Sequence, residues 1–473
     1  MSGDCGNPAL RALLAEAAIS NAALARAVVA SGAEEGVHLG TTPTSVRRML
    51  DGAQPRWPVP RLVAKVVGRR LRREVSLAEC GFADNGPPAE DPHDGLRSSG
   101  TLDGTLQSVI MLSSRDLSRR NFLIGSSFAA AAFAEPALHA LTVPPARITD
   151  HGGRDCISVA DVSVLQDHFN HLRRLDHQYG SGRIREQGVQ LLHGEATRLL
   201  HSSYSAKVGS ALLRVIAQVS WLAGSMAADV GRHALAQRYY IQTLNLALSN
   251  GDMAYAANIL GHMSRLTVHI GHGALTDADR TANGRHAVAL ARAGRSLAGS
   301  ATAPVLGALL LAIEARGHAL LGDAKEARRV VLEAERTFER SRPDSEPRWL
   351  DFYTQGEFFA DVGRSLRDTG ETEHAAQLID QALTSYEPWR TRSRSFVLTD
   401  LATTHLLSRN DEQALIYGAD AMKATTAVAS RRAVDRIRTL HRQVHPLRAK
   451  SSHLRALDDR LTAFRTRSEA AAP

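Results

Sequence analysis

Hydroxyl groups and a pair of arginines stand close together in the segment TTPTSVRRMLDG, residues 41–52. Guanidinium groups bind phosphate oxygens and the edges of guanine bases, and small hydroxyls bind phosphate as well. Side chains of these types at this spacing are therefore suited to contact with nucleic acid. The residues expected to read or clamp a DNA groove are Thr44, Ser45, Arg47 and Arg48.

The same segment has the pattern of a short amphipathic helix that would hold these side chains on one face. Thr42 can cap the helix, Pro43 suits its first position, and Gly52 can take the left-handed conformation that ends it. Apolar side chains recur three and four positions apart, so they would face a core together. These apolar residues are Val46, Met49 and Leu50.

Positive charge is concentrated around this segment. Residues 47–73 hold nine arginines and lysines against the single acid Asp51, a local net charge of +8 that equals the formal net charge of the whole chain. A basic surface of this kind attracts polyphosphate by releasing counterions. Arg56, Arg61 and Lys65 are accordingly expected to grip DNA phosphate. An acidic protein or a membrane surface would also be attracted, and a short basic helix is often an ordinary solvated element.

Two helices are predicted before this segment and one after it. Residues 7–18 and 21–31 have helical apolar spacing, with Ser20 as the cap of the second helix, and another apolar stripe lies within residues 62–71. The arrangement resembles the helix-turn-helix of the Cro/repressor type, with residues 21–31 as its first helix and 42–50 as its recognition helix. That motif usually has a connection of three or four residues, whereas SGAEEGVHLGTT inserts about eleven here.

Composition indicates an all-α protein with more than one domain. The chain has 473 residues, of which only 5% are aromatic, and it is long enough for two or three domains. Cys5, Cys80 and Cys156 are far apart and have no CxxC spacing. This argues against a disulfide framework or a cysteine zinc site and fits a reducing cytoplasm.

The chain is expected to contain four regions: a helix-turn-helix domain at 1–82, a flexible linker at 83–104, a helical connector at 105–154 and a helical solenoid at 155–473. The connector contains SRRNFL before an uncharged run, which looks like a twin-arginine export signal. A buried helix with a basic flank is preferred, because an export signal needs a short N-terminal lead and the run is too short to span a bilayer. The protein is therefore expected in the cytoplasm, at the nucleoid, without membrane contact.

Small residues recur at fixed spacings from residue 155 onward. Pairs seven positions apart repeat, and in most copies another small residue stands twelve positions earlier. Small side chains let two antiparallel helices approach closely, so the pattern predicts five helix hairpins after two or three degenerate helices. The best copy, FFADVGRSLRDTGETEHAAQLIDQAL, resembles a tetratricopeptide repeat, although the copies are spaced more widely than in that family. The pairs of small residues twelve positions apart are Gly224 and Ala236, Ala315 and Ala327, Gly363 and Ala375, and Ala402 and Ala414. In the copy that contains Ala282, the residue at this offset is Ile270, which suggests an insertion around GHGALTDAD.

Repeats of this kind resemble scaffolds that bind peptides or proteins on a concave wall built from the first helix of each hairpin. Side chains on that wall are candidates for contact with a partner or ligand, and ordinary solvated helix positions are the alternative. The candidates are Asn258, Arg265, Glu314, Tyr353, Glu357 and Thr399.

No catalytic constellation is found in the sequence, which lacks GxxxxGK[ST], GxSxG and HExxH stretches. His441 and His445 could share a helix face, but no carboxylate or cysteine stands beside them, so a surface pair is expected. His262, His269 and His272 lie near a turn without ligand-spaced partners. We therefore expect no enzymatic activity, no cofactor and no metal.

As a whole, the chain resembles the actinobacterial family of Cro/repressor-type regulators with a tetratricopeptide-like C-terminal region. The resemblance rests on NPALRALLAEAAISNAALARAVV, TSVRRMLDGAQPRWPVPRLV, SRRNFL, LDHQYGSG, DVGRHALAQRYYIQTLNLA and RSRSF. It implies a transcriptional regulator that binds double-stranded DNA, with a repeat domain for homodimer formation or for sensing a peptide, small molecule or protein. The alternative is an interaction adaptor whose basic N-terminal module binds an acidic protein and not DNA.

Overall fold

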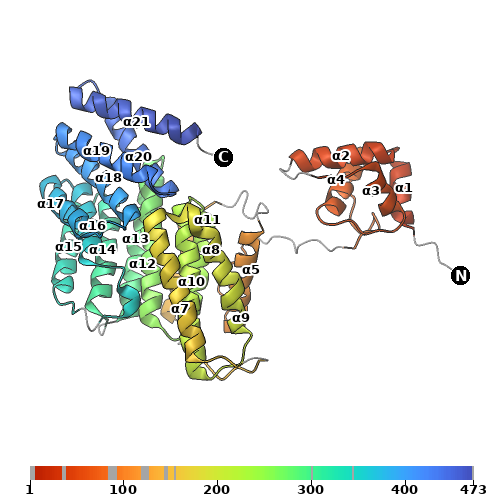
Figure 1. Ribbon diagram of the computed structural model, residues 1–473, viewed down its shortest axis with the longest axis horizontal. Helices are drawn as coiled ribbons and strands as arrows, with labels where there is room; N and C mark the ends of the chain where they lie inside the picture. The colour runs from red at the N-terminus through yellow and green to blue at the C-terminus, as the bar shows by residue number, and fades with distance from the viewer. Residues whose placement is uncertain are drawn as a thin grey trace. The chain divides into compact units, whose positions relative to one another are not determined.

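Figure 1 shows the computed structural model of the chain. It describes residues 6–34, 39–83, 93–118, 127–142, 148–153, 156–299, 302–342 and 346–470. The chain divides into two compact units, Met1–Asp91 and Pro92–Pro473. Across the described ranges both units are helical, and the only strand-like pairing consists of two isolated bridges, His151 with Tyr204 and Cys156 with Ser203. The predicted all-α fold is confirmed.

The first unit packs its described helices around one apolar core. Leu10, Leu24, Val46, Leu62 and Val63 have no exposed surface, so every helix contributes to that core. The helices are α1 (Pro8–Glu16), α2 (Asn21–Glu34), α3 (Pro43–Leu50) and α4 (Val59–Leu71).

Helix α2 has the predicted cap but a later end than predicted. The backbone N–H of Ala23 donates to the Ser20 hydroxyl at 3.2 Å. The helix continues three residues past Ser31, because the Ser31 side chain is buried (2% exposed) and not part of a solvated loop. The connection to α3 is correspondingly shorter than the predicted insertion, and its residues 35–38 lie outside the described residues.

The second unit begins with segments that pack onto its hairpins. The Arg238 guanidinium donates to the carbonyl of Asp94 at 2.9 Å, and the Gln242 amide donates to the carbonyl of Gly95 at 2.9 Å. Part of the segment that the sequence assigns to the linker and connector therefore belongs to this unit. Residues 119–123, which are all of the SRRNFL segment except Ser118, lie outside the described residues. The first helices of the unit are α5 (Leu102–Leu117), α6 (Ala134–Thr142), α7 (Val159–Tyr179), α8 (Ser181–Leu191) and α9 (Thr197–Leu200).

Five antiparallel hairpins follow, and they stack side by side as a solenoid in Figure 1. Each corresponds to one predicted repeat. A Cβ added to Gly363 would lie 2.6 Å from the Ile379 side chain, and one added to Gly224 would lie 2.9 Å from Tyr239, so small residues do permit the close helix approach. The hairpins are α10 (Ala206–Asp229) with α11 (His233–Ser249), α12 (Met253–His272) with α13 (Asp277–Ala298), α14 (Pro304–Leu320) with α15 (Ala324–Phe338), α16 (Gln355–Asp368) with α17 (Thr372–Ser385), and α18 (Thr391–Leu407) with α19 (Asp411–Thr426). They are followed by α20 (Arg431–Val444) and α21 (Ser452–Ala470).

The last helices of the second unit pack against its first helices. The N–H of Ala429 donates to the carbonyl of Tyr179 at 2.8 Å, and the N–H of Gly182 donates to the carbonyl of Ala429 at 2.8 Å. Helix α7 also packs against α18, and α10 against α20. The solenoid therefore closes on itself, which distinguishes it from an open concave wall.

One described helix, α10, is long and apolar enough to cross a membrane by length and composition. In this fold 83% of its most apolar window is buried, because the helix packs against α7, α8 and α11. The pair α1 and α2, bent by 90° at its break, passes the same test when counted as one span.

Candidate functional site

Helix α3 carries the side chains predicted to contact DNA on the face that points away from the core. Val46 and Met49 are buried at 0% and 4% exposure, whereas Thr44, Arg47 and Arg48 are exposed. Neither arginine side chain has a hydrogen bond or ion pair with another described residue. Both guanidinium groups are therefore available to a partner.

Ser45 has a different environment from the other predicted contacts. Its hydroxyl and that of Thr42 lie 3.0 Å apart, the N–H of Ser45 donates to the Thr42 hydroxyl at 3.2 Å, and the N–H of Thr42 donates to the Ser45 hydroxyl at 3.3 Å. This is a capping box that satisfies donors at the start of α3. Ser45 is half-buried and its hydroxyl serves the helix cap.

The carboxyl end of α3 is fixed to the rest of the first unit. The N–H of Asn7 donates to the carbonyl of Leu50 at 2.8 Å, and the Arg11 guanidinium donates to the same carbonyl at 3.3 Å. Asn7 also donates through its side chain to the carbonyl of Cys80 at 2.9 Å. Gly52, with φ of +97°, supplies the predicted left-handed residue after the helix. The position of α3 is thus set by contacts at both ends.

The predicted phosphate contacts lie on and before α4. Arg56 and Arg61 are exposed and Lys65 is half-buried, with the Arg61 guanidinium 6.0 Å from the centre of the Trp57 ring. A neighbouring basic residue, Arg73, is paired with an acid of its own unit.

That pair joins the Arg73 guanidinium to the carboxylate of Glu79 at 2.8 Å. A hydrogen bond from the Ser76 backbone, followed by the one from Arg73, lowers the pKa of Glu79 to about 2. The unit's acids therefore hold Arg73, while Arg47 and Arg48 stay unpaired within the described residues.

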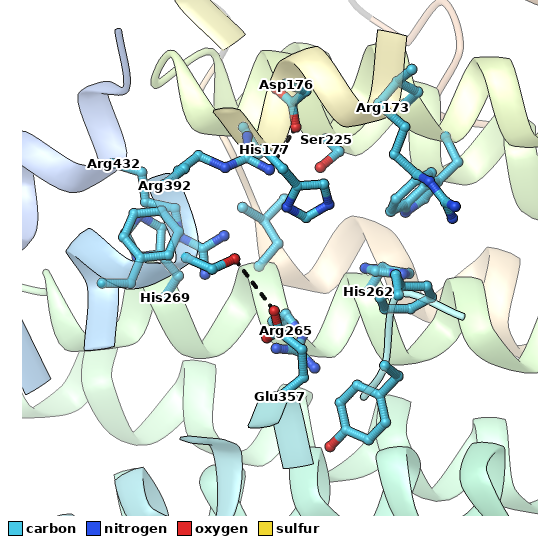
Figure 2. A pocket seen from close by; sticks show the side chains of 18 of the residues that line it. Arg173, Asp176, His177, Ser225, His262, Arg265, His269, Glu357, Arg392 and Arg432 are labelled. Carbon is cyan, nitrogen blue, oxygen red and sulfur yellow. Dashed lines mark hydrogen bonds and ion pairs between the residues drawn. The ribbon is translucent and has the colours of Figure 1, made fainter. Parts of the chain in front are cut away.

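The second candidate site is a cavity inside the closed solenoid, shown in Figure 2. It has a volume of about 120 Å³ and is lined by side chains from α7, α10, α11, α12, α16, α18 and α20, from the segment before α16 and from Tyr386 after α17. Arginines, histidines and aromatic rings dominate its wall. Helices from the beginning and the end of the second unit both contribute, so the cavity depends on closure of the solenoid.

Two buried carboxylates behind the wall are each shared by several arginines. Asp361 accepts from Arg265 at 2.7 Å, from Arg316 at 3.3 Å and from Arg364 at 3.2 Å. Burial alone would raise the pKa of Asp361, but these guanidinium groups outweigh it and hold the pKa at about 2. Asp400 is bound in the same way by Arg364, Arg367 and Arg436.

Arg392 joins the first and last parts of the second unit across the cavity wall. Its guanidinium lies 2.5 Å from the Asp176 carboxylate on α7 and 3.6 Å from the Asp229 carboxylate at the end of α10. The Ser430 hydroxyl donates to Asp229 at 2.8 Å, and the Ser181 hydroxyl donates to Asp176 at 2.6 Å. The segments LDHQYGSG, DVGRHALAQRYYIQTLNLA and RSRSF therefore converge here, although they are far apart in the sequence.

Positive charge exceeds negative charge around the cavity. The charged residues that line it, together with the ion-pair network behind them, comprise nine arginines and six carboxylates. The arginines are Arg173, Arg265, Arg316, Arg364, Arg367, Arg390, Arg392, Arg432 and Arg436, and the carboxylates are Asp176, Asp229, Glu357, Asp361, Asp368 and Asp400.

Histidines on the cavity wall are held in the neutral form. Burial lowers the pKa of His262 to about 3, and the positive charges of Arg265 and Arg432 act in the same direction. Burial, followed by neighbouring arginines, also lowers the pKa of His177 and His269 well below the usual value. The histidines therefore add hydrogen-bonding groups to the wall without adding charge at neutral pH.

The structure places half of the predicted ligand-contacting residues at the cavity. Arg265, Tyr353 and Glu357 line it, whereas the other three are used elsewhere. Glu314 is buried and binds Arg292 and Arg295 of α13, each at 2.7 Å.

Two of the predicted residues are buried within helix packing. Asn258 is 2% exposed, and Thr399 is 4% exposed with its hydroxyl donating to the carbonyl of Ser395 at 2.8 Å. The sequence pattern assumed an open concave wall, so it included Glu314 of α14, which does not line the cavity, and it did not identify Arg173, Arg392 or Arg432 as lining residues.

His441 and His445 do have a carboxylate neighbour. Asp458 of α21 lies 3.1 Å from Nε2 of His441 and 3.1 Å from Nδ1 of His445. The potential ligand atoms of the three residues lie within 4.8 Å of one another. Sequence reasoning missed this cluster because Asp458 is brought to the histidines by the turn between α20 and α21 and not by local spacing.

Comparison with known families finds one match in the first unit. The family model of the SP15 N-terminal domain matches residues 10–83, the range that contains α2, α3 and α4 and most of α1. No curated protein matches the chain. Residues 10–83 are thus similar to the SP15 N-terminal domain.

Proposed function

We propose that this protein is a transcriptional regulator that binds double-stranded DNA through helix α3. The observation that carries the proposal is the pair Arg47 and Arg48, which are exposed beside Thr44 and have no acidic partner among the described residues. Unpaired guanidinium groups on a rigid helix can bind guanine edges and phosphate without first breaking an internal ion pair. Arg56, Arg61 and Lys65 would supply phosphate contacts at the flank.

The second unit would regulate this activity. Its hairpins support the role suggested by the tetratricopeptide-like resemblance, which is homodimer formation or the sensing of a ligand. Its closed form and internal cavity favour sensing of something small over the wrapping of a long peptide.

The test uses the full-length protein and two double variants matched in charge. Arg47→Ala plus Arg48→Ala removes two cations from α3, and Arg280→Ala plus Arg285→Ala removes two exposed cations from α13. Fragments enriched from genomic DNA by the wild-type protein would be titrated with each protein by fluorescence anisotropy.

The α3 variant should bind these fragments at least tenfold more weakly, because each well-placed arginine contact contributes about 1–3 kcal/mol. The α13 variant should bind like the wild type. Equal affinity of all three proteins for DNA would count against the proposal. Recovery of one stoichiometric acidic protein from nuclease-treated lysate, together with no DNA enrichment from untreated lysate, would support the adaptor alternative.

A further inference from the structure

The cavity of the second unit contains cations that the protein itself does not pair. Arg173 and Arg432 have no ion pair or hydrogen bond in the part of the chain that the structure describes. Each guanidinium instead lies over an aromatic ring, Phe169 at 5.5 Å for Arg173 and Phe396 at 5.2 Å for Arg432. Carboxylates act on these two charges only at longer range, Asp351 on Arg173 and Asp229 on Arg432, and neither forms an ion pair with them.

The two unpaired cations lie on different sides of the cavity. In Figure 2, Arg432 is next to Arg392 on one side, and Arg173 lies above His262 on the other. A molecule bound between them would meet positive charge at either end.

Several neutral polar groups of the wall also have no partner within the described residues. These are Nδ1 of His177, Nε2 of His262 and Nε1 of Trp221, together with Nε of Arg432. A buried polar group without a partner costs folding free energy, and a group on a ligand would satisfy it. Because the indole and guanidinium nitrogens can only donate hydrogen bonds, a ligand that satisfies them must carry several hydrogen-bond acceptors.

One part of the wall is a cluster of flat rings. The centre of the Trp221 ring lies 4.9 Å from that of His262 and 6.1 Å from that of Phe352. Rings at these separations present apolar faces against which a flat or apolar group can pack. The wall therefore combines cations and donors with an apolar surface.

We propose that this cavity binds a small organic anion, with a carboxylate or phosphate group on Arg432 and an apolar part against Trp221 and Phe352. The volume of about 120 Å³ sets the size. It is roughly ten times the space that holds one water molecule, which is room for a small metabolite and not for a protein segment.

The pKa values of the wall are consistent with this assignment. Burial lowers the pKa of the Arg432 guanidinium to about 10, so it stays charged at neutral pH although its environment disfavours the charge. A bound oxyanion would remove that unfavourable interaction. The inference concerns the second unit alone, so it stands or falls separately from DNA binding.

The test measures binding to the full-length protein by thermal shift and isothermal titration calorimetry at neutral pH, without DNA. The probes are benzoate and phenyl phosphate, which share the proposed chemistry, with benzamide as the uncharged analogue and inorganic phosphate as the anion without an apolar part. At least one of the first two should raise the melting temperature and bind more tightly than either control, and which of them does so distinguishes a carboxylate from a phosphate ligand.

Two variants separate a ligand-binding arginine from a structural one. Arg432→Met should weaken probe binding roughly tenfold to a hundredfold, the usual range for a lost charge-assisted hydrogen bond. Arg280→Met, at an exposed position on α13, should leave binding unchanged.

Without any probe, Arg432→Met should melt at the same temperature as the wild type or higher, because it removes a half-buried cation that forms no ion pair among the described residues. A clear fall in the melting temperature would instead assign Arg432 a structural role and overturn the proposal. The absence of binding by both anionic probes at millimolar concentration, or equal binding by Arg432→Met, would overturn it as well.

Discussion

At the scale of single residues, the second unit is organised by carboxylates that each bind more than one arginine. Asp361 and Asp400 together contact five different arginines, and Arg364 contacts both acids. Removing charges from water is unfavourable, and in such a network each ion depends on the others for compensation. Loss of one member is therefore expected to cost more than loss of an exposed ion pair.

Arg392 is the member of this kind of network whose loss should destabilise the second unit most clearly. Arg392→Met would leave Asp176 and Asp229 buried without their shared cation, and the expected loss is about 3–5 kcal/mol of unfolding free energy. Chemical denaturation of the full-length protein measures it. Arg285→Met, at an exposed position on α13, is the control and should change stability by less than about 0.5 kcal/mol. A loss for Arg392→Met as small as that of the control would show that closure does not depend on this contact.

Histidine burial predicts how stability depends on pH. Burial, the largest cause, lowers the pKa of His262 to about 3 and that of His272 to about 4, so both take up protons more readily in the unfolded chain. Unfolding free energy should therefore fall as the pH drops below about 6.5, by about 1.4 kcal/mol per pH unit for each such histidine. Asp361 has a pKa of about 2, lowered from its usual value, so its contribution to the unfolding free energy is lost only as the pH falls below about 4.

Urea unfolding between neutral pH and about pH 5 measures this slope, since the histidines dominate there. The double variant His262→Gln plus His272→Gln should show a shallower slope. A wild-type stability that is constant over this range would contradict the assignment of neutral, buried histidines.

At the scale of elements, small residues determine how closely the two helices of each hairpin approach. The sequence was sufficient to predict this, because Gly363 with Ala375 and the related pairs recur at a fixed offset, and each pair lies at a hairpin in the structure. Local spacing carries no information about contacts between distant helices. The sequence pattern therefore could not predict the contact between Arg392 and Asp176 at the cavity. It could not predict that Asp458 lies beside His441 either.

Gly363→Ala tests the close approach. Its new Cβ would lie 2.6 Å from Cγ1 of the fully buried Ile379, so we expect destabilisation of about 1–3 kcal/mol from overpacking. Gly194→Ala is the matched control, because that helical glycine has open space around it and alanine has the better helix propensity. Thermal unfolding compares the two, and similar melting temperatures would argue that the hairpin can adjust.

At the scale of the whole molecule, the chain consists of two units with separate apolar cores. The core of the first unit contains only residues from Leu10 to Phe82, and the clusters of the second unit contain none of these. Cooperative unfolding follows shared cores, so the two units are expected to unfold as separate transitions. The boundary near residue 91 was less predictable from sequence, since Asp94 and Gly95 lack an apolar period yet bind α11.

Leu62→Ala distinguishes the transitions. Leu62 is fully buried in the first core, so its truncation should cost about 2–5 kcal/mol there. Differential scanning calorimetry should show one transition moving to lower temperature and the other staying in place. A shift of both transitions together would indicate a single cooperative protein.

Closure of the solenoid also sets an order of events during synthesis. Helices α1 to α4 leave the ribosome first and hold a complete core, whereas the cavity needs Arg392 of α18 and Arg432 of α20. The first unit can thus complete its core before the residues that close the cavity have been synthesised. A premature stop codon after α17 would leave the core of the first unit complete and would remove Arg392 and Arg432 from the cavity wall.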